Sequence, residues 1–264
     1  MMHIDVFDRY RAGESVLHRL DARVKVALTG LFILSNVLLP DGAWPAFALA
    51  LALIVGLSVL AGLGPGFAIL RSFVALPFAL AAVTTLFSLP GQPLFNLRLG
   101  PWLLTATDAG ALRFSSILIR SLLSVQAAIL LTTTTSFPDL IHALRHLRLP
   151  RTLVSVIAFM YRYLFVLADE ALRLLRARAA RSAHLPGRKG GGGLLWRARV
   201  AGNMAGQLFI RSFERSDRVY NAMLARGYRG HLYTLTPHHM RRQDWLAAAG
   251  GVLLLLFLQA LARA

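Results

Sequence analysis

The chain has 264 residues, of which 56% are hydrophobic, and it carries a formal net charge of +17. A mean hydropathy of +0.57 is too high for an ordinary soluble domain. Together with the positive charge it indicates a membrane protein that has a large basic part on one side of the bilayer. The absence of cysteine excludes disulfides, thiolate zinc sites and cysteine nucleophiles. A basic charge can also indicate nucleic-acid binding, but apolar segments enclose the basic region here, so we expect no nucleic acid among the partners.

The first 23 residues are polar and charged, which is not the composition of a cleavable signal peptide. Apolar segments follow, each near the length that a helix needs to cross about 30 Å of hydrocarbon. Four of them belong to an N-terminal membrane region, 1–135, and a fifth belongs to a C-terminal region, 243–264. The predicted spans are 24–39, 43–63, 72–89, 111–134 and 245–261.

Two features of the membrane region are not plain apolar helix. Arg120 lies deep in the fourth span and is expected to face other helices or a partner, because an arginine is costly in lipid. The loop 90–109 alternates in polarity around Gly100-Pro101, which predicts a small β-hairpin. An irregular loop with Trp102 at the level of the lipid headgroups fits the same residues equally well.

The positive charge is concentrated in one segment. Residues 137–242 hold 19 of the 29 Lys and Arg residues and five acidic ones. Because Lys and Arg concentrate in cytoplasmic loops, we predict that 136–242 and the N-terminus are cytoplasmic. The apolar part of 151–170 is short, and Arg162 interrupts it. A span there would carry the later arginines outside, so we interpret it as the buried half of a long helix that does not cross.

The cytoplasmic segment is predicted to contain one short and two long helices. Ser136 and Pro138 have the residue types of a helix start, and the short helix runs from there to Leu147. No Gly or Pro interrupts 151–184, and a second long helix, 194–226, follows a glycine-rich linker. The fold class is therefore an all-α membrane protein with about five transmembrane helices and a cytoplasmic domain of three helices.

Small residues repeat at four-residue spacing in the second long helix. They are Ala198, Gly202 and Gly206, and the first long helix has a shorter repeat at Ala179 and Ala183. Such stripes let two helix backbones approach closely, so we infer that the two long helices cross there. The same residues are also compatible with helices that share no such contact.

Both long helices end in an arginine flanked by small residues. The two triplets are Ala180-Arg181-Ser182 and Ala225-Arg226-Gly227. The planar fork of arginine binds carboxylates in a bidentate manner, and small neighbours leave it accessible. One arginine at a helix C-terminus is explained by the helix dipole alone, but two such ends favour docking to a soluble partner.

Residues for chemistry within this chain are scarce. His142 and His146 are four apart on the short helix, yet only Asp139 is near enough in sequence to be a third metal ligand, so we predict no metal site. The spans contain essentially no acids or histidines, which an intramembrane enzyme would need. A permease acting alone would need polar residues along several spans, and the fourth span alone offers them.

The sequence resembles a known family at several places. The stretches 170–182, 211–217 and 221–228 resemble the transmembrane T component of energy-coupling factor (ECF) transporters. His3-Ile4-Asp5 and the stretch Leu17-His18-Arg19-Leu20-Asp21-Ala22-Arg23-Val24-Lys25 resemble its cobalt branch, CbiQ. In this stretch we interpret Asp21 and Arg23 as a helix entry.

The resemblance implies a scaffold rather than an enzyme. It joins a substrate-binding membrane subunit to two ABC-type ATPases, and Arg181 and Arg226 would seat in grooves on these ATPases. Ala180, Ser182, Ala225 and Gly227 would shape these contacts. An apolar face of the first long helix would contact the substrate-binding subunit through Val154, Ile157, Phe159, Met160 and Phe165.

The same resemblance implies the partners and the location. We expect CbiO-like ATPases that carry ATP and Mg²⁺, a CbiM-like substrate-binding subunit with a CbiN-like small subunit as a further candidate, and membrane lipid. No cofactor is expected on this chain itself. The location would be the inner membrane of a bacterium. The expected substrate is cobalt, with nickel or a vitamin as alternatives.

Overall fold

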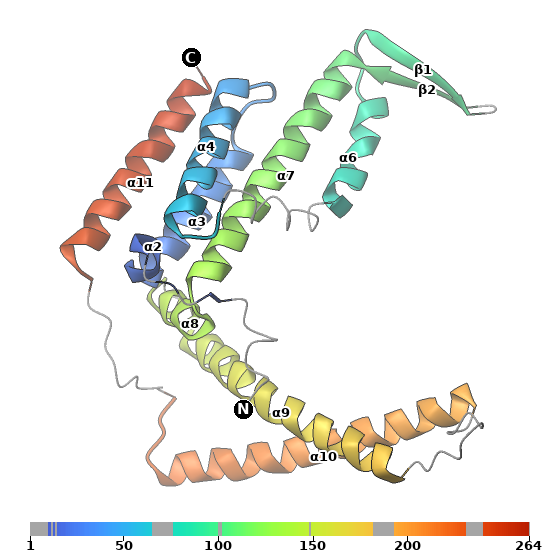
Figure 1. Cartoon of the computed structure of the whole chain (residues 1–264), viewed down its shortest axis with the longest axis vertical. Coiled ribbons are helices and arrows are strands. Elements are labelled where there is room, and N and C mark those ends of the chain that lie inside the picture. The colour runs from blue at the N-terminus through green and yellow to red at the C-terminus, as the bar shows by residue number, and fades with distance from the viewer. Residues whose placement is uncertain are drawn as a thin grey trace. The chain divides into compact units, whose positions relative to one another are not determined.

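The computed structural model describes residues 10–11, 13, 15–64, 76–99, 102–147, 149–181, 193–230 and 240–263. It divides into two compact units. One contains α2–α4, α6–α8, α11 and the strands β1 and β2, and we call it the membrane unit; the other contains α9 and α10 (Figure 1). The elements are α2 Val16–Arg19, α3 Ala22–Val37, α4 Trp44–Leu60, α6 Leu76–Ser88, β1 Pro93–Leu99, β2 Trp102–Thr107, α7 Asp108–Thr134, α8 Phe137–His146, α9 Arg151–Arg181, α10 Leu194–Ala225 and α11 Arg242–Leu261.

The chain is a helical membrane protein, as predicted. Among the described residues, three helices are long and apolar enough to cross a membrane: α7, α11 and α9 from Thr152 onward. α4 is apolar but shorter, and at 1.5 Å per residue its 17 residues extend for about 25 Å. Because α9 meets the same criteria of length and composition, the expectation that 151–170 does not span stays a prediction.

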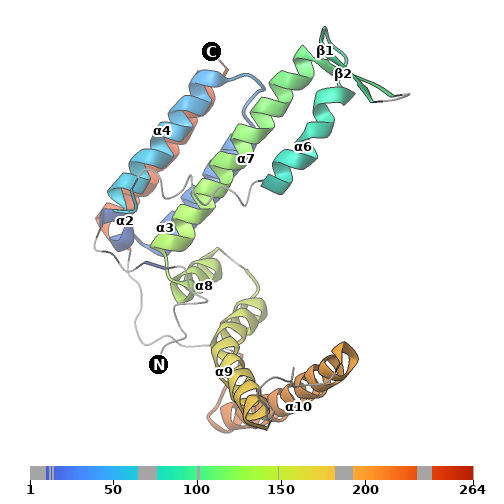
Figure 2. The same ribbon diagram turned by 45° about the vertical axis from the view of Figure 1, so that its right-hand side comes forward.

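Four helices of the membrane unit pack around one apolar core. α3 contacts α7 and α11, and α4 contacts both of these as well (Figure 2). Gly251 allows the close approach of α11 to α3, because a Cβ there would lie 2.7 Å from the Leu28 side chain. The core residues are Phe32, Leu39, Ala46, Phe47, Ala50, Ile54, Leu123, Ala127 and Leu258. Helices far apart in the sequence thus form one bundle.

A polar cluster holds the turn between α3 and α4. The guanidinium of Arg120 donates to the Leu39 carbonyl at 2.6 Å and to the Asp41 carboxylate at 2.7 Å, and it lies over the Phe47 ring. Asn36 donates to the Arg120 carbonyl. Arg120 therefore faces other parts of the chain, as predicted, and this pairing offsets part of the cost of placing its charge in the bundle.

At the other end of the bundle a second polar cluster joins three helix ends. Asp21 caps α3 by accepting from Arg23 N, and its own N–H donates to Asp244 at 2.9 Å. Asp244, on the first turn of α11, also accepts from the Arg241 backbone. The Lys25 ammonium donates to the Thr134 carbonyl at the end of α7. The interpretation of Asp21 and Arg23 as a helix entry is confirmed, and the cluster ties α3 to α7 and α11.

The short helix α8 begins as its sequence predicts. The Ser136 hydroxyl accepts from the Asp139 backbone and donates to its carboxylate, and Pro138 occupies the first turn. α8 packs against α3, so it belongs to the membrane unit. The charge pattern groups α8 with the long helices in 136–242, because charge alone does not show which helix it contacts.

The loop after α6 is a β-hairpin. β1 and β2 pair in antiparallel register, with Leu97 opposite Leu104 and Arg98 opposite Leu103. The hairpin connects α6 to α7, which contact one another. Of the two predicted conformations for 90–109, the structure therefore has the hairpin.

Candidate functional site

α9 combines two different surfaces in one continuous helix. Pro150 precedes it and accepts the first helical bond from Val154 N, and no Gly or Pro follows until after its last described residue. Its first half is apolar and its second half is basic, so the helix becomes polar toward Arg181. Ala180 and Arg181 are exposed at that end. Ser182, the third residue of the predicted triplet, lies outside the described residues.

α10 ends at a glycine in the left-handed conformation. Gly227 has φ +80°, its N–H donates to the Leu224 carbonyl at 2.9 Å, and the Tyr228 N–H donates to the Met223 carbonyl at 2.9 Å. This pair of bonds is a Schellman motif, which satisfies the last helical carbonyls and stops the helix. Arg226 is left exposed at the C-cap. Gly227 therefore determines that α10 ends directly before it, with Arg226 at the C-cap.

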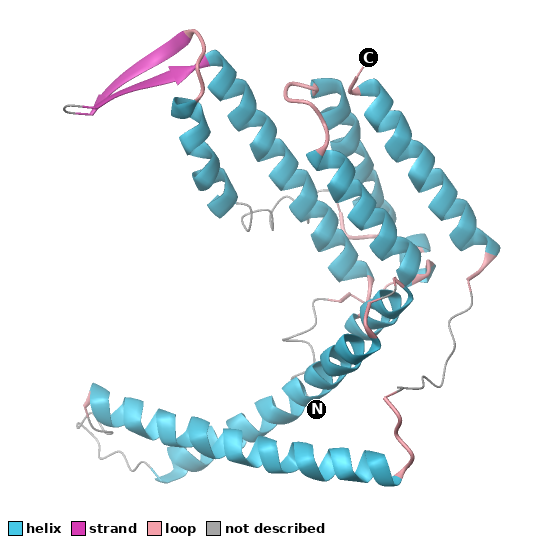
Figure 3. Ribbon diagram, turned by 180° about the vertical axis from the view of Figure 1, so that it is seen from behind, coloured by secondary structure: helices cyan, strands magenta, loops and turns pink. Residues whose placement is uncertain are grey.

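The two long helices cross, and an ionic fork joins them (Figure 3). The Glu170 carboxylate on α9 accepts from Arg211 on α10 at 2.6 Å and from Arg173 on its own helix. The hydrogen bond from Arg211 lowers the pKa of Glu170 below its ordinary 4.5, and the charge of Arg173 acts in the same direction. Glu170 is thus charged near neutral pH.

The crossing uses a different face of α10 from the predicted one. A Cβ added at Gly202 or Gly206 would meet no atom within 4 Å, and Ala198 is exposed. The inference that this stripe permits the close crossing was therefore wrong. Half-buried residues recur instead at spacings of three and four on another face of each helix: Val200, Met204, Leu208, Ser212, Arg215, Val219 and Met223 on α10, and Leu167, Ala171, Leu174 and Arg178 on α9.

The residues predicted to contact a membrane subunit differ in exposure. Val154 is buried, at 7% exposed, whereas Met160 is 58% exposed. Ile157, Phe159 and Phe165 are half-buried. Their role stays a prediction. An exposed apolar stripe runs beside them, with spacings of three and four, through Leu153, Val156, Met160 and Leu164.

A second exposed apolar group lies on α10. Phe209, Ile210 and Phe213 are exposed, as are Tyr220 and Leu224 nearer the arginine end. None of the residues of α10 is buried within the described structure. This group and three members of the stripe on α9 were not predicted from the sequence, although their spacings of three and four on basic helices are a usable signal. Large exposed apolar groups mark surfaces that bind partners or lipid.

The two histidines of α8 lie next to one another, one helical turn apart. His146 Nδ1 lies 3.1 Å from the His142 carbonyl, and the two rings are 4.8 Å apart. Within the described part of the chain, no three His, Cys, Asp or Glu residues gather as metal ligands do.

Comparison with known proteins points to one family. The sequence model of the CbiQ family, described as "Cobalt transport protein", matches residues 13–238. The energy-coupling factor transporter transmembrane protein EcfT of Lacticaseibacillus paracasei is 28% identical over 97% of each chain. EcfT of Listeria innocua is 30% identical over 87% of each chain. The cobalt transport protein CbiQ of Salmonella typhimurium is 29% identical over 60% of this chain and 70% of its own length.

Proposed function

The chain belongs to the CbiQ family, the cobalt-type branch of the T components of ECF transporters, and from that premise we propose that it couples ATPase motion to cobalt uptake. In this proposal it is a non-catalytic subunit of an ATP-driven importer in the inner membrane of a bacterium. Its N-terminus, α9 and α10 face the cytoplasm.

The observation that supports the proposal best is the pair of exposed arginines at the helix ends. Arg181 ends α9, and Arg226 caps α10. Each stands at the negative end of a helix dipole, with its fork accessible. We propose that each arginine, with its flanking Ala180 or with Ala225 and Gly227, docks in a groove of one ABC-type ATPase. Acidic side chains or carbonyls in that groove would accept hydrogen bonds from the arginine guanidinium.

The helix crossing suggests how motion is transmitted. ATP binding closes the two ATPases and moves the two docked helix ends. Because the Glu170 fork joins α9 and α10 away from these ends, the helices pivot there. The apolar part of α9, including Met160 and the predicted contacts Val154, Ile157, Phe159 and Phe165, then moves against the substrate-binding subunit.

The proposed assembly assigns catalysis and substrate recognition to other subunits. ATP and Mg²⁺ bind to two CbiO-like ATPases, and a CbiM-like subunit, with a CbiN-like small subunit, receives the metal. The chain itself supplies no cofactor site in this proposal. Cobalt is favoured over nickel or a vitamin because the family description and the Salmonella relative name cobalt transport.

Charge reversal at the helix ends tests the docking. In cells that express the chain with its ATPases, Arg181→Glu and Arg226→Glu should each lower ATPase copurification by about 30-fold, which corresponds to about 2 kcal/mol for a docking arginine. Cobalt uptake should be lost. Arg176→Glu and Arg218→Glu reverse exposed charges on the same helices and should leave both readouts near the wild type.

Two results would contradict the proposal. Full uptake with both end arginines reversed would exclude them as docking residues. Cobalt uptake by the chain alone, in vesicles without ATPases, would show a permease instead. Competition of cobalt uptake by nickel or by a vitamin, measured in vesicles that contain the complete complex, identifies the substrate.

A further inference from the structure

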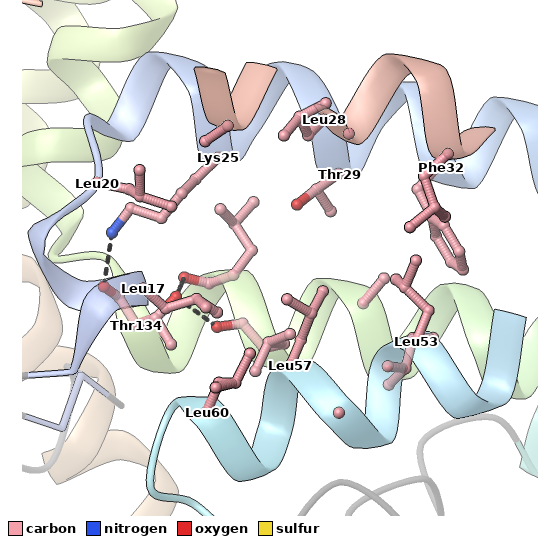
Figure 4. A pocket seen from close by; sticks show the side chains of 18 of the residues that line it. Leu17, Leu20, Lys25, Leu28, Thr29, Phe32, Leu53, Leu57, Leu60 and Thr134 are labelled. Atoms are coloured by element: carbon pink, nitrogen blue, oxygen red, sulfur yellow. Dashed lines mark hydrogen bonds between the residues drawn. The ribbon is translucent and has the colours of Figure 1, made fainter. Parts of the chain in front are cut away.

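A cavity of about 430 Å³ lies between α3, α4, α7 and α11 in the membrane unit. Its wall is almost wholly apolar, and Leu130 and Leu254 are typical of it. Leu28, Phe32 and Leu57 are further examples (Figure 4). A space with such a wall does not hold ordered water, because water there would lack hydrogen-bond partners. In a membrane the remaining candidates are hydrocarbon or the side chain of another protein.

Two glycines at the edge of the cavity face open space. Gly56 on α4 and Gly250 on α11 line the cavity and are exposed. A Cβ added at either would meet no atom within 4 Å. Glycine is a poor helix former, and no described neighbour packs against these two positions. Their smallness leaves room for something that is not part of the described chain.

One end of the cavity is charged. Among the described residues that line it, Lys25 alone is charged, and its ammonium donates to the Thr134 carbonyl at 3.0 Å. An ammonium has three donors, so Lys25 can also bind a phosphate. Asp21 and Asp244 lie at this same end of the bundle, where Asp21 N–H donates to the Asp244 carboxylate at 2.9 Å, so a headgroup that carries an amine as well as a phosphate matches both signs of charge there. Figure 4 shows Lys25 and Leu20 at one end and Phe32 and Leu53 at the other.

We propose that this cavity is a phospholipid site, with one acyl chain between the four helices and the phosphate beside Lys25. An apolar cavity of about 150 Å³ holds one benzene, so about 430 Å³ has room for on the order of 15 carbon atoms. The lipid class that the charges favour is phosphatidylethanolamine. The site depends on the membrane unit alone and not on the proposed coupling function.

The test uses the full chain in vesicles that contain phosphatidylethanolamine with a photoreactive diazirine in its acyl chain. After irradiation, mass spectrometry locates the labels. We expect labels on the cavity-lining Leu57 and Leu254. Gly250→Leu on α11 and Gly56→Leu on α4 each add a large side chain at the cavity wall and should lose these labels. Gly30→Leu is the matched control, because Gly30 also faces open space but does not line the cavity.

Labelling of the exposed Leu80 on α6 reports general contact with lipid and should be the same in all variants. Equal labelling of Leu57 and Leu254 in the filled variants and in Gly30→Leu, with unchanged helical content, would overturn the acyl-chain site. Lys25→Gln should lose phosphatidylethanolamine that stays bound through detergent purification. Retention equal to the wild type would overturn the position of the phosphate.

Discussion

At the scale of single residues, Gly227 has the most constrained conformation of the candidate site. Gly227→Ala would place a Cβ at φ +80°, which costs about 1–2 kcal/mol and should fray the end of α10 around Arg226. We expect a lower melting temperature in detergent and weaker ATPase copurification. Gly206→Ala on the same helix is the control, since alanine there should stabilise by about 1 kcal/mol. Equal effects of the two changes would contradict this role of Gly227.

Asp244 is the residue on which the second polar cluster of the membrane unit depends most. It is 4% exposed and accepts backbone N–H groups from Asp21 and Arg241. Asp244→Ala leaves both donors without their acceptor and should cost about 1–3 kcal/mol per unsatisfied group. Asp244→Asn keeps one acceptor and should lose less. Thermal unfolding in detergent measures both, and an unchanged melting temperature for Asp244→Ala would refute the assignment.

At the scale of helices, the Glu170 fork makes the crossing of α9 and α10 dependent on pH. Because its pKa is lowered in the folded chain, the contribution of Glu170 is complete above about 4.5, the ordinary value. It is lost as the pH falls through the lowered value. Spin labels at Arg176 and Arg218, in a chain without other cysteines, should give a distance distribution that broadens on acidification.

The same distribution should be broad at neutral pH in Glu170→Gln, which lacks the charge that Arg211 and Arg173 bind. Glu214→Gln is a suitable control because it removes an acid from the same helix pair without touching the fork. A narrow distribution in Glu170→Gln at all pH values would show that apolar packing alone fixes the crossing.

Helix starts are predictable from the sequence where local chemistry decides. Ser136 and Pro138 start α8 as predicted, because capping depends on adjacent residues. The crossing face of α10 was predicted wrongly because Gly202 and Gly206 have the residue types of a close contact, whereas the structure leaves them in open space. Which side of a helix meets its partner is set by residues distant in sequence, here Glu170 and Arg211.

At the scale of the whole molecule, the sequence predicts which residues belong to the candidate docking site but not how they are arranged in space. The triplets around Arg181 and Arg226 stand out by their residue types, and the structure leaves both arginines exposed at helix ends. The fork at Glu170 and the cavity beside Lys25 could not be predicted. The first requires two helices that are separated by a linker. The second requires lining residues from several helices, which lie between residues 17 and 255 of the chain.

The most direct measurement of the central claim is site-specific cross-linking of the helix ends to the ATPases. Because the chain has no cysteine, Arg181→Cys and Arg226→Cys each give it one thiol for a short photoreactive cross-linker. We predict that both cross-link to an ATPase subunit in the purified complex, and that Trp44→Cys, at the start of α4, does not. Cross-links from neither helix end, in a complex that still copurifies and transports cobalt, would contradict the account.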